Sequence, residues 1–72
     1  MNEIVEKRLN LIKAMTEEIQ SMCECALDDC DDVTESSDLF IIESQMDRII
    51  RKADYARETV RNTYDEFDEE EN

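Results

Sequence analysis

Four residue types are missing from this 72-residue sequence, which has no glycine, proline, histidine or tryptophan. Without glycine and proline, the usual signals for tight turns and β-hairpins are absent, and no segment alternates apolar and polar residues as a half-buried strand does. Without histidine, the sequence lacks both the commonest metal ligand and the usual base that activates a nucleophile. We therefore expect an all-α, non-enzymatic protein with no cofactor and no metal site.

Long apolar runs are also missing. No stretch of 18 apolar residues is present to span a membrane, and the first residues, MNEIVEKRLN, lack the apolar segment of a signal peptide. We therefore expect a cytoplasmic protein. The length predicts a single domain, residues 1–72, that is too short to enclose a large catalytic cleft.

Basic residues are few relative to acidic ones. The 8 Lys and Arg residues stand against 21 Asp and Glu residues, so the formal net charge is −13. A chain with this charge is repelled by the phosphates of nucleic acids and by anionic membrane surfaces, which makes both poor direct partners. The charge instead predicts a partner with a basic protein surface.

Three cysteines, Cys23, Cys25 and Cys30, form the pattern C-x-C-x4-C. An odd number does not fit the paired disulfides of small secreted domains, so we expect free thiols. A structural zinc site needs four converging ligands, and the acidic stretch nearby has neither the spacing nor the glycine of a calcium-binding EF-hand loop. Neither feature predicts a metal centre.

Apolar residues recur with heptad spacing in both halves of the chain, which predicts two long helices that pack as in a coiled coil. In the first half, residues seven apart are interleaved with a second series four positions later. The predicted first seam is Val5, Leu9, Ile12, Thr16, Ile19, Cys23, Ala26, Cys30 and Val33. The predicted second seam is Leu39, Ile42, Met46, Ile49, Ala53, Ala56, Val60, Thr63 and Phe67.

The segment DDVTESSD, residues 31–38, predicts the break between the helices. Ser36 or Ser37 can cap the second helix, and the charge of Asp38 is favoured in its first turn. A short connection implies an antiparallel helical hairpin. The predicted boundaries are helix 2–31, turn 32–37, helix 38–67 and a frayed acidic tail 68–72.

Apolar residues remain outside the first predicted seam. A two-helix unit buries little surface, so we expect either a homodimer that forms a four-helix bundle or docking on another protein. Plain core packing is the alternative for these side chains, and methionine favours it. The predicted dimer or docking strip is Ile4, Leu11, Met15 and Met22.

Carboxylates cluster on helix faces turned away from the seams. Such runs usually form a solvated face that keeps a protein soluble. The alternative is nucleic-acid mimicry, in which rows of carboxylates on a rigid helix occupy a basic groove built for phosphates. Basic residues between positions 48 and 61 dilute this charge along the second helix. The predicted partner-binding residues are Glu24, Asp28, Asp29, Asp31, Asp32, Glu35, Asp38, Glu43, Asp47, Asp54 and Glu58.

In size, charge and helical simplicity, with carboxylate clusters in CALDDCDDVTESSD and YDEFDEEEN, the chain resembles the small acidic inhibitors that phages encode against host defences, anti-CRISPR proteins among them. This class shares no common fold, so the resemblance transfers no site residues. It implies a stoichiometric inhibitor in the host cytoplasm that occupies the basic nucleic-acid channel of a nuclease or defence complex, or blocks its assembly.

The segments IVEKRLNLIKAM and ESQMDRII are similar to the small helical-hairpin phosphatases that dephosphorylate a sporulation response regulator, whose second helix carries a Ser-Gln-Glu-Leu-Asp signature. In register, only Met46 and Asp47 match that signature, and the pair Ser44 and Gln45 is displaced by one position. The resemblance implies that Asp47 would position a water against an aspartyl phosphate. A phosphatase and a structural scaffold are the alternatives to an inhibitor.

Overall fold

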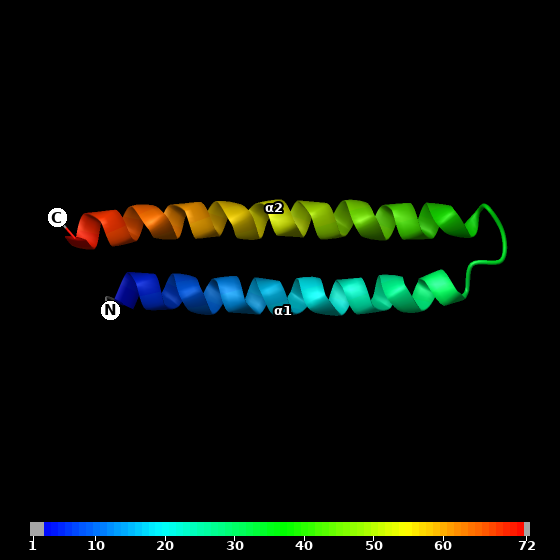
Figure 1. The fold of residues 1–72 in the computed structure, drawn as a ribbon, viewed down its shortest axis with the longest axis horizontal. Helices are drawn as coiled ribbons and strands as arrows, with labels where there is room; N and C mark the ends of the chain where they lie inside the picture. The colour runs from blue at the N-terminus through cyan, green and yellow to red at the C-terminus, as the bar shows by residue number, and fades with distance from the viewer. Residues whose placement is uncertain (1–2, 72) are drawn as a thin grey trace.

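Two long helices and a short turn make up the part of the chain that the structure describes, which is residues 3–71, with side chains for residues 3–67. In this computed structural model, α1 spans Glu3–Asp31 and α2 spans Asp38–Glu71. The helices are antiparallel, so the start of α1 and the end of α2 lie at the same end of a rod of 57 × 14 × 10 Å (Figure 1). The predicted all-α helical hairpin is confirmed.

The turn covers residues 32–37, where the sequence places it. The end of α2 differs from the prediction, because the helix continues through residues 68–71, which were expected to fray. That segment contains no glycine or proline to end a helix, and glutamate is a good helix former. The predicted helical residue Asn2 and the last residue of the predicted tail, Asn72, lie outside the described residues.

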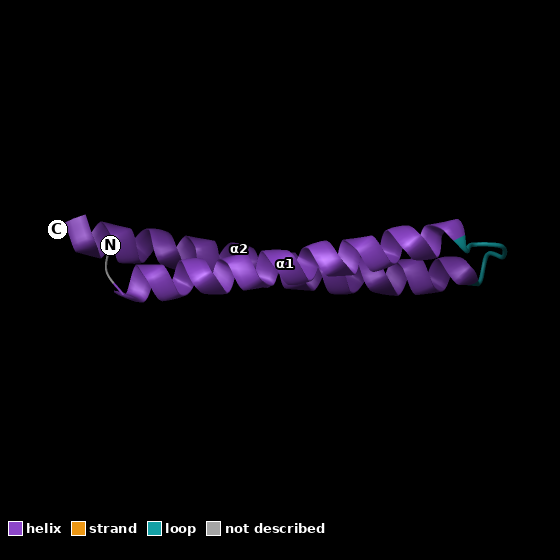
Figure 2. Ribbon diagram, turned by 90° about the horizontal axis from the view of Figure 1, so that it is seen from below, coloured by secondary structure: helices purple, strands orange, loops and turns teal. Residues whose placement is uncertain are grey.

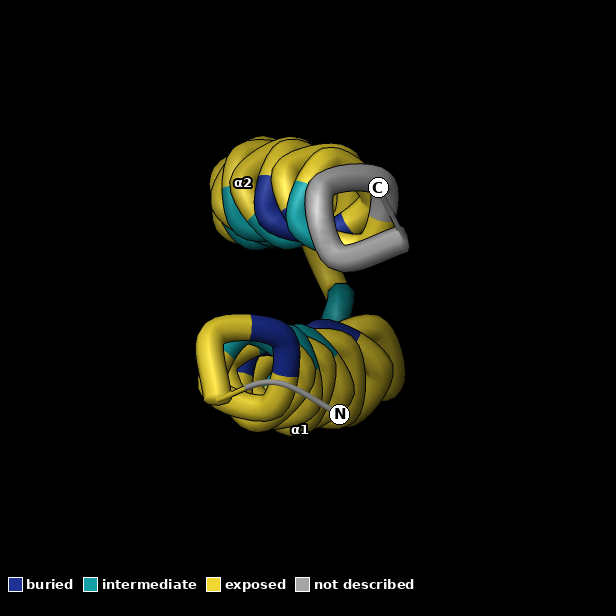
Figure 3. Tube along the Cα trace, turned by 90° about the vertical axis from the view of Figure 1, so that its left-hand side faces the viewer, coloured by how far each residue is buried: buried dark blue, intermediate teal, exposed yellow. Residues whose placement is uncertain are grey.

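The helices contact each other along a seam in which residues recur at alternating steps of three and four. They cross at a shallow angle (Figure 2), and their buried and half-buried positions lie on facing sides (Figure 3). On α1 and just after it, these positions are Val5, Arg8, Ile12, Met15, Ile19, Met22, Ala26, Asp29 and Val33. On α2 they are Asp38, Ile42, Gln45, Ile49, Lys52, Ala56, Thr59, Thr63 and Glu66.

Half of each predicted seam is correct, and the other half is displaced by one residue. The series of residues seven apart that begin at Val5 and at Ile42 lie in the seam as predicted. The second series on each helix is wrong, because its members are exposed and the residue before each member lies in the seam instead. The exposed members are Leu9, Thr16, Cys23, Cys30, Leu39, Met46, Ala53, Val60 and Phe67.

On α1, the displacement brings larger side chains into the seam. Met15 and Met22 replace a threonine and a cysteine, and the longer thioether side chains bury more apolar surface. On α2, the displacement brings in Thr59, whose hydroxyl donates a hydrogen bond of 3.2 Å to the carbonyl of Tyr55. A buried hydroxyl that bonds its own helix in this way needs no partner from α1.

The displacement also brings polar side chains of the two helices together. Arg8 Nη2 lies 3.4 Å from Glu66 Oε1 near one end of the seam, and Gln45 Nε2 donates a hydrogen bond to Asp29 near the other. A buried polar group is tolerated when it has a partner, and paired polar groups fix how two helices align. Hydrophobicity alone would not select these residues for the seam.

The carboxylate of Asp38 closes the turn. Its Oδ2 accepts hydrogen bonds from the backbone N–H groups of Thr34 and Glu35, at 2.9 and 3.1 Å, and from the Thr34 hydroxyl at 3.3 Å. Ser37 directly precedes α2, but its hydroxyl donates to the Glu35 carboxylate at 3.3 Å. Asp38 therefore anchors the entry to α2, in place of the side-chain caps predicted for Ser36 or Ser37.

Candidate functional site

The negative charge is concentrated at the two ends of the hairpin. Residues 24–38 contain seven carboxylates and no basic residue, and residues 65–71 contain six carboxylates and no basic residue. Between them, residues 43–61 of α2 contain four acidic and five basic residues. Because residues 24–38 form the turn end of the rod and residues 65–71 lie at the opposite end (Figure 1), two acidic ends flank a nearly neutral middle of α2.

Most carboxylates at the turn end are open to solvent. Two of the seven are half-buried: Asp29 accepts a hydrogen bond from Gln45, and Asp38 accepts the hydrogen bonds that close the turn. These two have structural roles and are less available to a partner than predicted. The other five are exposed, and they are Glu24, Asp28, Asp31, Asp32 and Glu35.

The electrostatics of Asp38 follow from its place in the turn. The N–H groups of Thr34 and Glu35 donate to its carboxylate and hold the pKa of Asp38 below the usual aspartate value, because they stabilise the ionised form. Asp38 therefore stays negative while it orders the turn. The exposed carboxylates beside it are presented from a fixed loop.

Apolar side chains are also exposed in the first turn of α2, which follows the turn segment. Phe40 is 70% exposed, and Ile41 beside it is exposed as well. A shallow hollow at this end is lined by Asp29, Asp32, Asp38, Ile41 and Ile42. Exposed aromatic and aliphatic side chains within a charged rim are typical of surfaces that bind proteins. We call the following residues the acidic tip: Glu24, Asp28, Asp31, Asp32, Glu35, Phe40 and Ile41.

The last turn of α1 carries Asp28, Asp29 and Asp31 and no basic residue. The C-terminal end of a helix carries a partial negative charge, so carboxylates are unfavourable there, by roughly 0.3–1 kcal/mol each at low ionic strength. The acidic tip therefore holds carboxylates at a place where they reduce helix stability. Selection for stability alone would favour lysine or arginine at these positions.

The carboxylates predicted along α2 do not form an uninterrupted acidic row. Glu43, Asp47, Asp54 and Glu58 are exposed, but arginine and lysine residues alternate with them. Asp54 Oδ1 lies 3.0 Å from Arg57 Nη2, so one of the four is already paired. The part of the predicted site that presents unpaired negative charge in one place is the acidic tip.

The predicted docking strip is divided by the structure. Met15 is only 5% exposed and Met22 is half-buried, and both lie in the seam against α2. Ile4 and Leu11 are exposed. The strip therefore does not exist as a single free surface, because the displaced seam takes up its two methionines.

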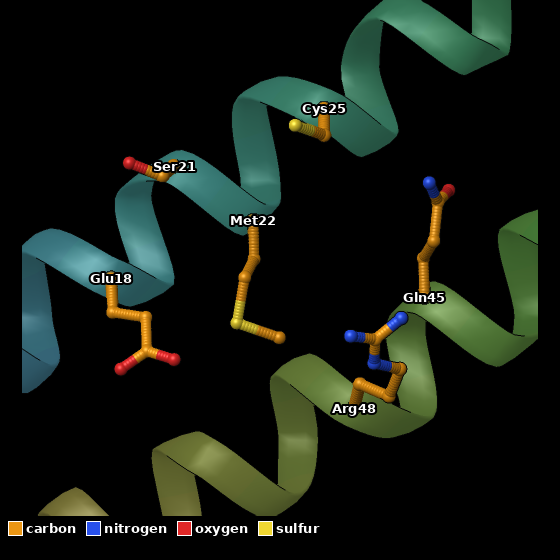
Figure 4. Close-up of a pocket in the computed structure, with 6 residues that line it drawn as sticks. All are labelled: Glu18, Ser21, Met22, Cys25, Gln45 and Arg48. Carbon is orange, nitrogen blue, oxygen red and sulfur yellow. The ribbon is translucent and has the colours of Figure 1, made fainter.

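A groove between the helices was not foreseen from the sequence. It is lined by Glu18, Ser21, Met22 and Cys25 of α1 and by Gln45 and Arg48 of α2, with Met22 reaching across toward α2 (Figure 4). Next to it, Lys52 Nζ lies 3.1 Å from Glu18 Oε2. Of its polar side chains, Glu18 forms this ion pair and Gln45 donates its hydrogen bond to Asp29.

The residues of the phosphatase-like segment do not converge on one point. Gln45 is half-buried in the seam, whereas Ser44 and Asp47 are exposed on other sides of α2. Residues two apart on a helix do not face each other, so Gln45 and Asp47 lie on different sides of α2. The water-positioning role that the resemblance implies for Asp47 stays a prediction.

The three cysteines are free and exposed. Cys23 and Cys30 belong to the displaced half of the predicted seam, so their expected burial is wrong. Among the side chains that the structure describes, no group of three or more Cys, Asp or Glu residues could hold a metal ion. Neither helix, over its described length, is apolar enough to cross a membrane.

Comparison of the chain with protein-family models, with curated proteins and with solved structures gives no match.

Proposed function

We propose that this protein is a non-catalytic inhibitor that binds a basic surface of a nucleic-acid-binding protein through its acidic tip. The partner class is a nuclease or a CRISPR-type defence complex, and the tip competes there with the phosphates of the nucleic acid. In this proposal the protein acts in the cytoplasm, which is that of the host cell if a phage encodes it.

The observation that carries the proposal is the placement of the carboxylates at the turn end. Residues 24–38 hold seven of them with no basic residue, and three lie in the last turn of α1, where they oppose the helix dipole. A solubilising charge could be placed anywhere on a rod that is exposed along its length. Charge that is concentrated where it reduces stability fits a binding role. Residues 65–71 at the end of α2 are acidic in the same way, so the charge-reversal experiment compares the two ends directly.

The apolar side chains of the acidic tip favour a protein as the partner, because they add contacts that charge alone does not provide. A duplex carries one charge per about 1.7 Å of axis, so carboxylates on a single hairpin cannot match its charge density alone. Phe40 and Ile41 add apolar contacts that a basic groove with an aliphatic or aromatic wall can receive. Electrostatic attraction then determines the encounter rate, and the apolar contacts slow dissociation.

Charge reversal at the tip tests the proposal. In the tip variant, Asp28, Asp31, Asp32 and Glu35 are replaced by lysine. The matched control replaces Asp68, Glu69, Glu70 and Glu71 by lysine, which changes the net charge equally at the opposite end. Each chain is immobilised and exposed to nuclease-treated host lysate at about 50 mM and about 500 mM NaCl, so that the Debye length falls roughly threefold.

We expect the unmodified chain and the control to capture the same nucleic-acid-binding protein, and the tip variant to bind it about a hundredfold more weakly. The unmodified chain should release it at high salt, and should displace labelled nucleic acid from the purified partner at equimolar amounts. Equal capture by the tip variant contradicts the proposed site. Salt-resistant capture of a protein that binds no nucleic acid instead supports the alternative of a scaffold that docks through apolar surface.

A further inference from the structure

One side of the seam presents apolar side chains along α2 and at both ends of α1. At the end opposite the turn, Leu9 of α1 lines a hollow with Val60, Tyr64 and Phe67 of α2. Residues seven apart stay on the same side of a heptad seam, so the exposed series that contains Val60 continues this surface along α2 to the turn. The exposed series that contains Leu9 continues it along α1, with Thr16 as its one polar member. We call it the apolar face, and it comprises Leu9, Cys23, Leu27, Cys30, Leu39, Met46, Ile50, Ala53, Val60, Tyr64 and Phe67.

The apolar face carries almost no net charge. The charged residues at the helical positions that border it are Glu6 and Lys13 on α1 and Glu43 and Arg57 on α2, two of each sign. A basic partner would find no complementary charge on this side. Two copies of the chain can meet there without bringing their acidic surfaces together, although each chain carries a net charge of −13.

One whole side of the hairpin has the area that a stable dimer needs. One side of a rod of 57 by 14 Å offers about 800 Å², which is what each partner contributes to a standard protein interface. Within the described side chains, the apolar ones that are buried in the hairpin are Val5, Met15 and Ala26. A two-helix unit with so small a core needs a further layer of apolar contacts for stability.

We propose that a second copy of this chain covers the apolar face, so that two hairpins form a four-helix bundle. In this arrangement Cys23 and Cys30 are enclosed between the hairpins, whereas Cys25, which lines the groove on the other side of the seam, stays at the surface. Asp28 lies two residues from Cys30, about 200° around α1, and remains free for the acidic tip. The inference uses a different surface from the proposed function and stands independently of it.

The mass of the chain in solution tests the proposal. Under reducing conditions, light scattering on the unmodified chain between about 1 and about 200 μM should report a dimer of about 17 kDa, twice the 8.5 kDa of one chain. The variant Met46→Glu with Val60→Glu places two charges on the apolar face and should remain at 8.5 kDa. Circular dichroism measures whether each variant is helical, and the thiol-alkylation test below needs no variant if the monomeric one unfolds.

The matched control is Leu11→Glu with Ile41→Glu. These two side chains are 46% and 56% exposed, compared with 41% and 37% for Met46 and Val60, but they lie on the opposite side of the seam. The control should still dimerise. An unmodified helical chain that stays at 8.5 kDa throughout overturns the proposal and assigns the apolar face to a different protein. Dissociation by the control pair alone overturns it as well, and places the interface on the other side.

Thiol alkylation gives a second test that needs no variant. Iodoacetamide labelling of the unmodified chain is followed by mass spectrometry at low and at high protein concentration. At the higher concentration, Cys23 and Cys30 should react about tenfold more slowly relative to Cys25 than they do in dilute solution, because dimerisation protects only the first two. Relative rates that do not change with concentration overturn the proposed face.

Discussion

The side-chain amide of Gln45 on α2 donates a hydrogen bond to the carboxylate of Asp29 on α1, and both residues are half-buried in the seam. Gln45 Oε1 is buried and, among the side chains described, has no hydrogen-bond partner. The amide therefore depends on Asp29 for its pairing. A buried polar pair between two helices favours one rotation and register, and this pair lies next to the acidic tip.

A double-mutant cycle on this pair should reveal strong coupling. Asp29→Leu leaves the buried amide of Gln45 without its partner and should lower the free energy of unfolding by about 1–2 kcal/mol. Asp29→Leu with Gln45→Leu should restore or exceed the stability of the unmodified chain, because two apolar side chains then meet in the seam. Urea unfolding followed by circular dichroism at one protein concentration measures both. Gln45→Leu alone completes the cycle, and a double variant whose loss equals the sum of the two single losses would contradict the pairing.

The helical hairpin could be predicted because heptad spacing, the absence of glycine and proline, and the polar segment before Asp38 all favour it. The rotation of each helix about its own axis, which decides which residues face the partner helix, could not be predicted. The series from Val5 is compatible with apolar neighbours either three or four positions later, and the sequence offers more apolar residues at four. In the structure, the residues three positions later lie in the seam. Met15 and Met22 fill it there, and polar groups such as Gln45 have partners across it.

The candidate site was predictable to the same degree. The excess of carboxylates at residues 24–38 is evident in the sequence, and the structure leaves five of the seven exposed. The structural use of Asp29 and Asp38 was not evident, because it depends on Gln45 and on the turn. The apolar face was also missed, since eight of its eleven residues were predicted to lie in the seam itself.

Substitution of Met15 should separate the seam from the surface. Met15 is 5% exposed, so Met15→Ala should lower the free energy of unfolding by about 2–3 kcal/mol through lost burial and the cavity left behind. Leu11, one turn earlier, is the matched control, and Leu11→Ala should lower it by less than about 1 kcal/mol because this side chain is largely exposed. Chemical denaturation of both variants compares them. Equal losses of stability would indicate that Met15 and Leu11 are equally exposed, as the predicted docking strip requires.

The hydrogen bonds to Asp38 predict a pH-dependent contribution to stability. The pKa of Asp38 is lowered from the ordinary value of 3.8, so the folded state favours the ionised carboxylate. The stabilisation is therefore fully present above the ordinary pKa and is lost as the pH falls through the lower pKa of the folded state. Asp38→Asn should lower the melting temperature at pH 7, and the difference from the unmodified chain should shrink below about pH 4.

Asp47→Asn is the control for this experiment. It removes the same charge from an exposed position on α2. Its melting temperature should differ little from that of the unmodified chain, with no trend between pH 7 and about pH 3 that resembles the one for Asp38. Thermal unfolding followed by circular dichroism gives both curves. If the melting temperature of Asp38→Asn lies below that of the unmodified chain by the same amount at every pH, the amide destabilises the turn for reasons unrelated to charge.

Neutralisation of the tip should affect stability and binding in opposite directions. Asp28→Asn, Asp31→Asn and Asp32→Asn together remove charges that repel one another and oppose the dipole of α1, so the free energy of unfolding should rise by about 1–2 kcal/mol at low salt. About 500 mM NaCl should remove most of this gain by screening. Binding to the basic partner should weaken in the same variant.

The matched control neutralises Asp47, Asp54 and Glu58, which alternate with basic residues on α2, and Asp54 pairs with Arg57 at 3.0 Å. Loss of these favourable pairs should leave stability unchanged or slightly lower. A tip variant that gains stability while it loses binding would mean that the chain keeps carboxylates at the turn at the expense of its own fold, which solubility does not require. A tip variant that loses stability would show that these carboxylates support the hairpin, and the charge at the turn would then need no partner to explain it.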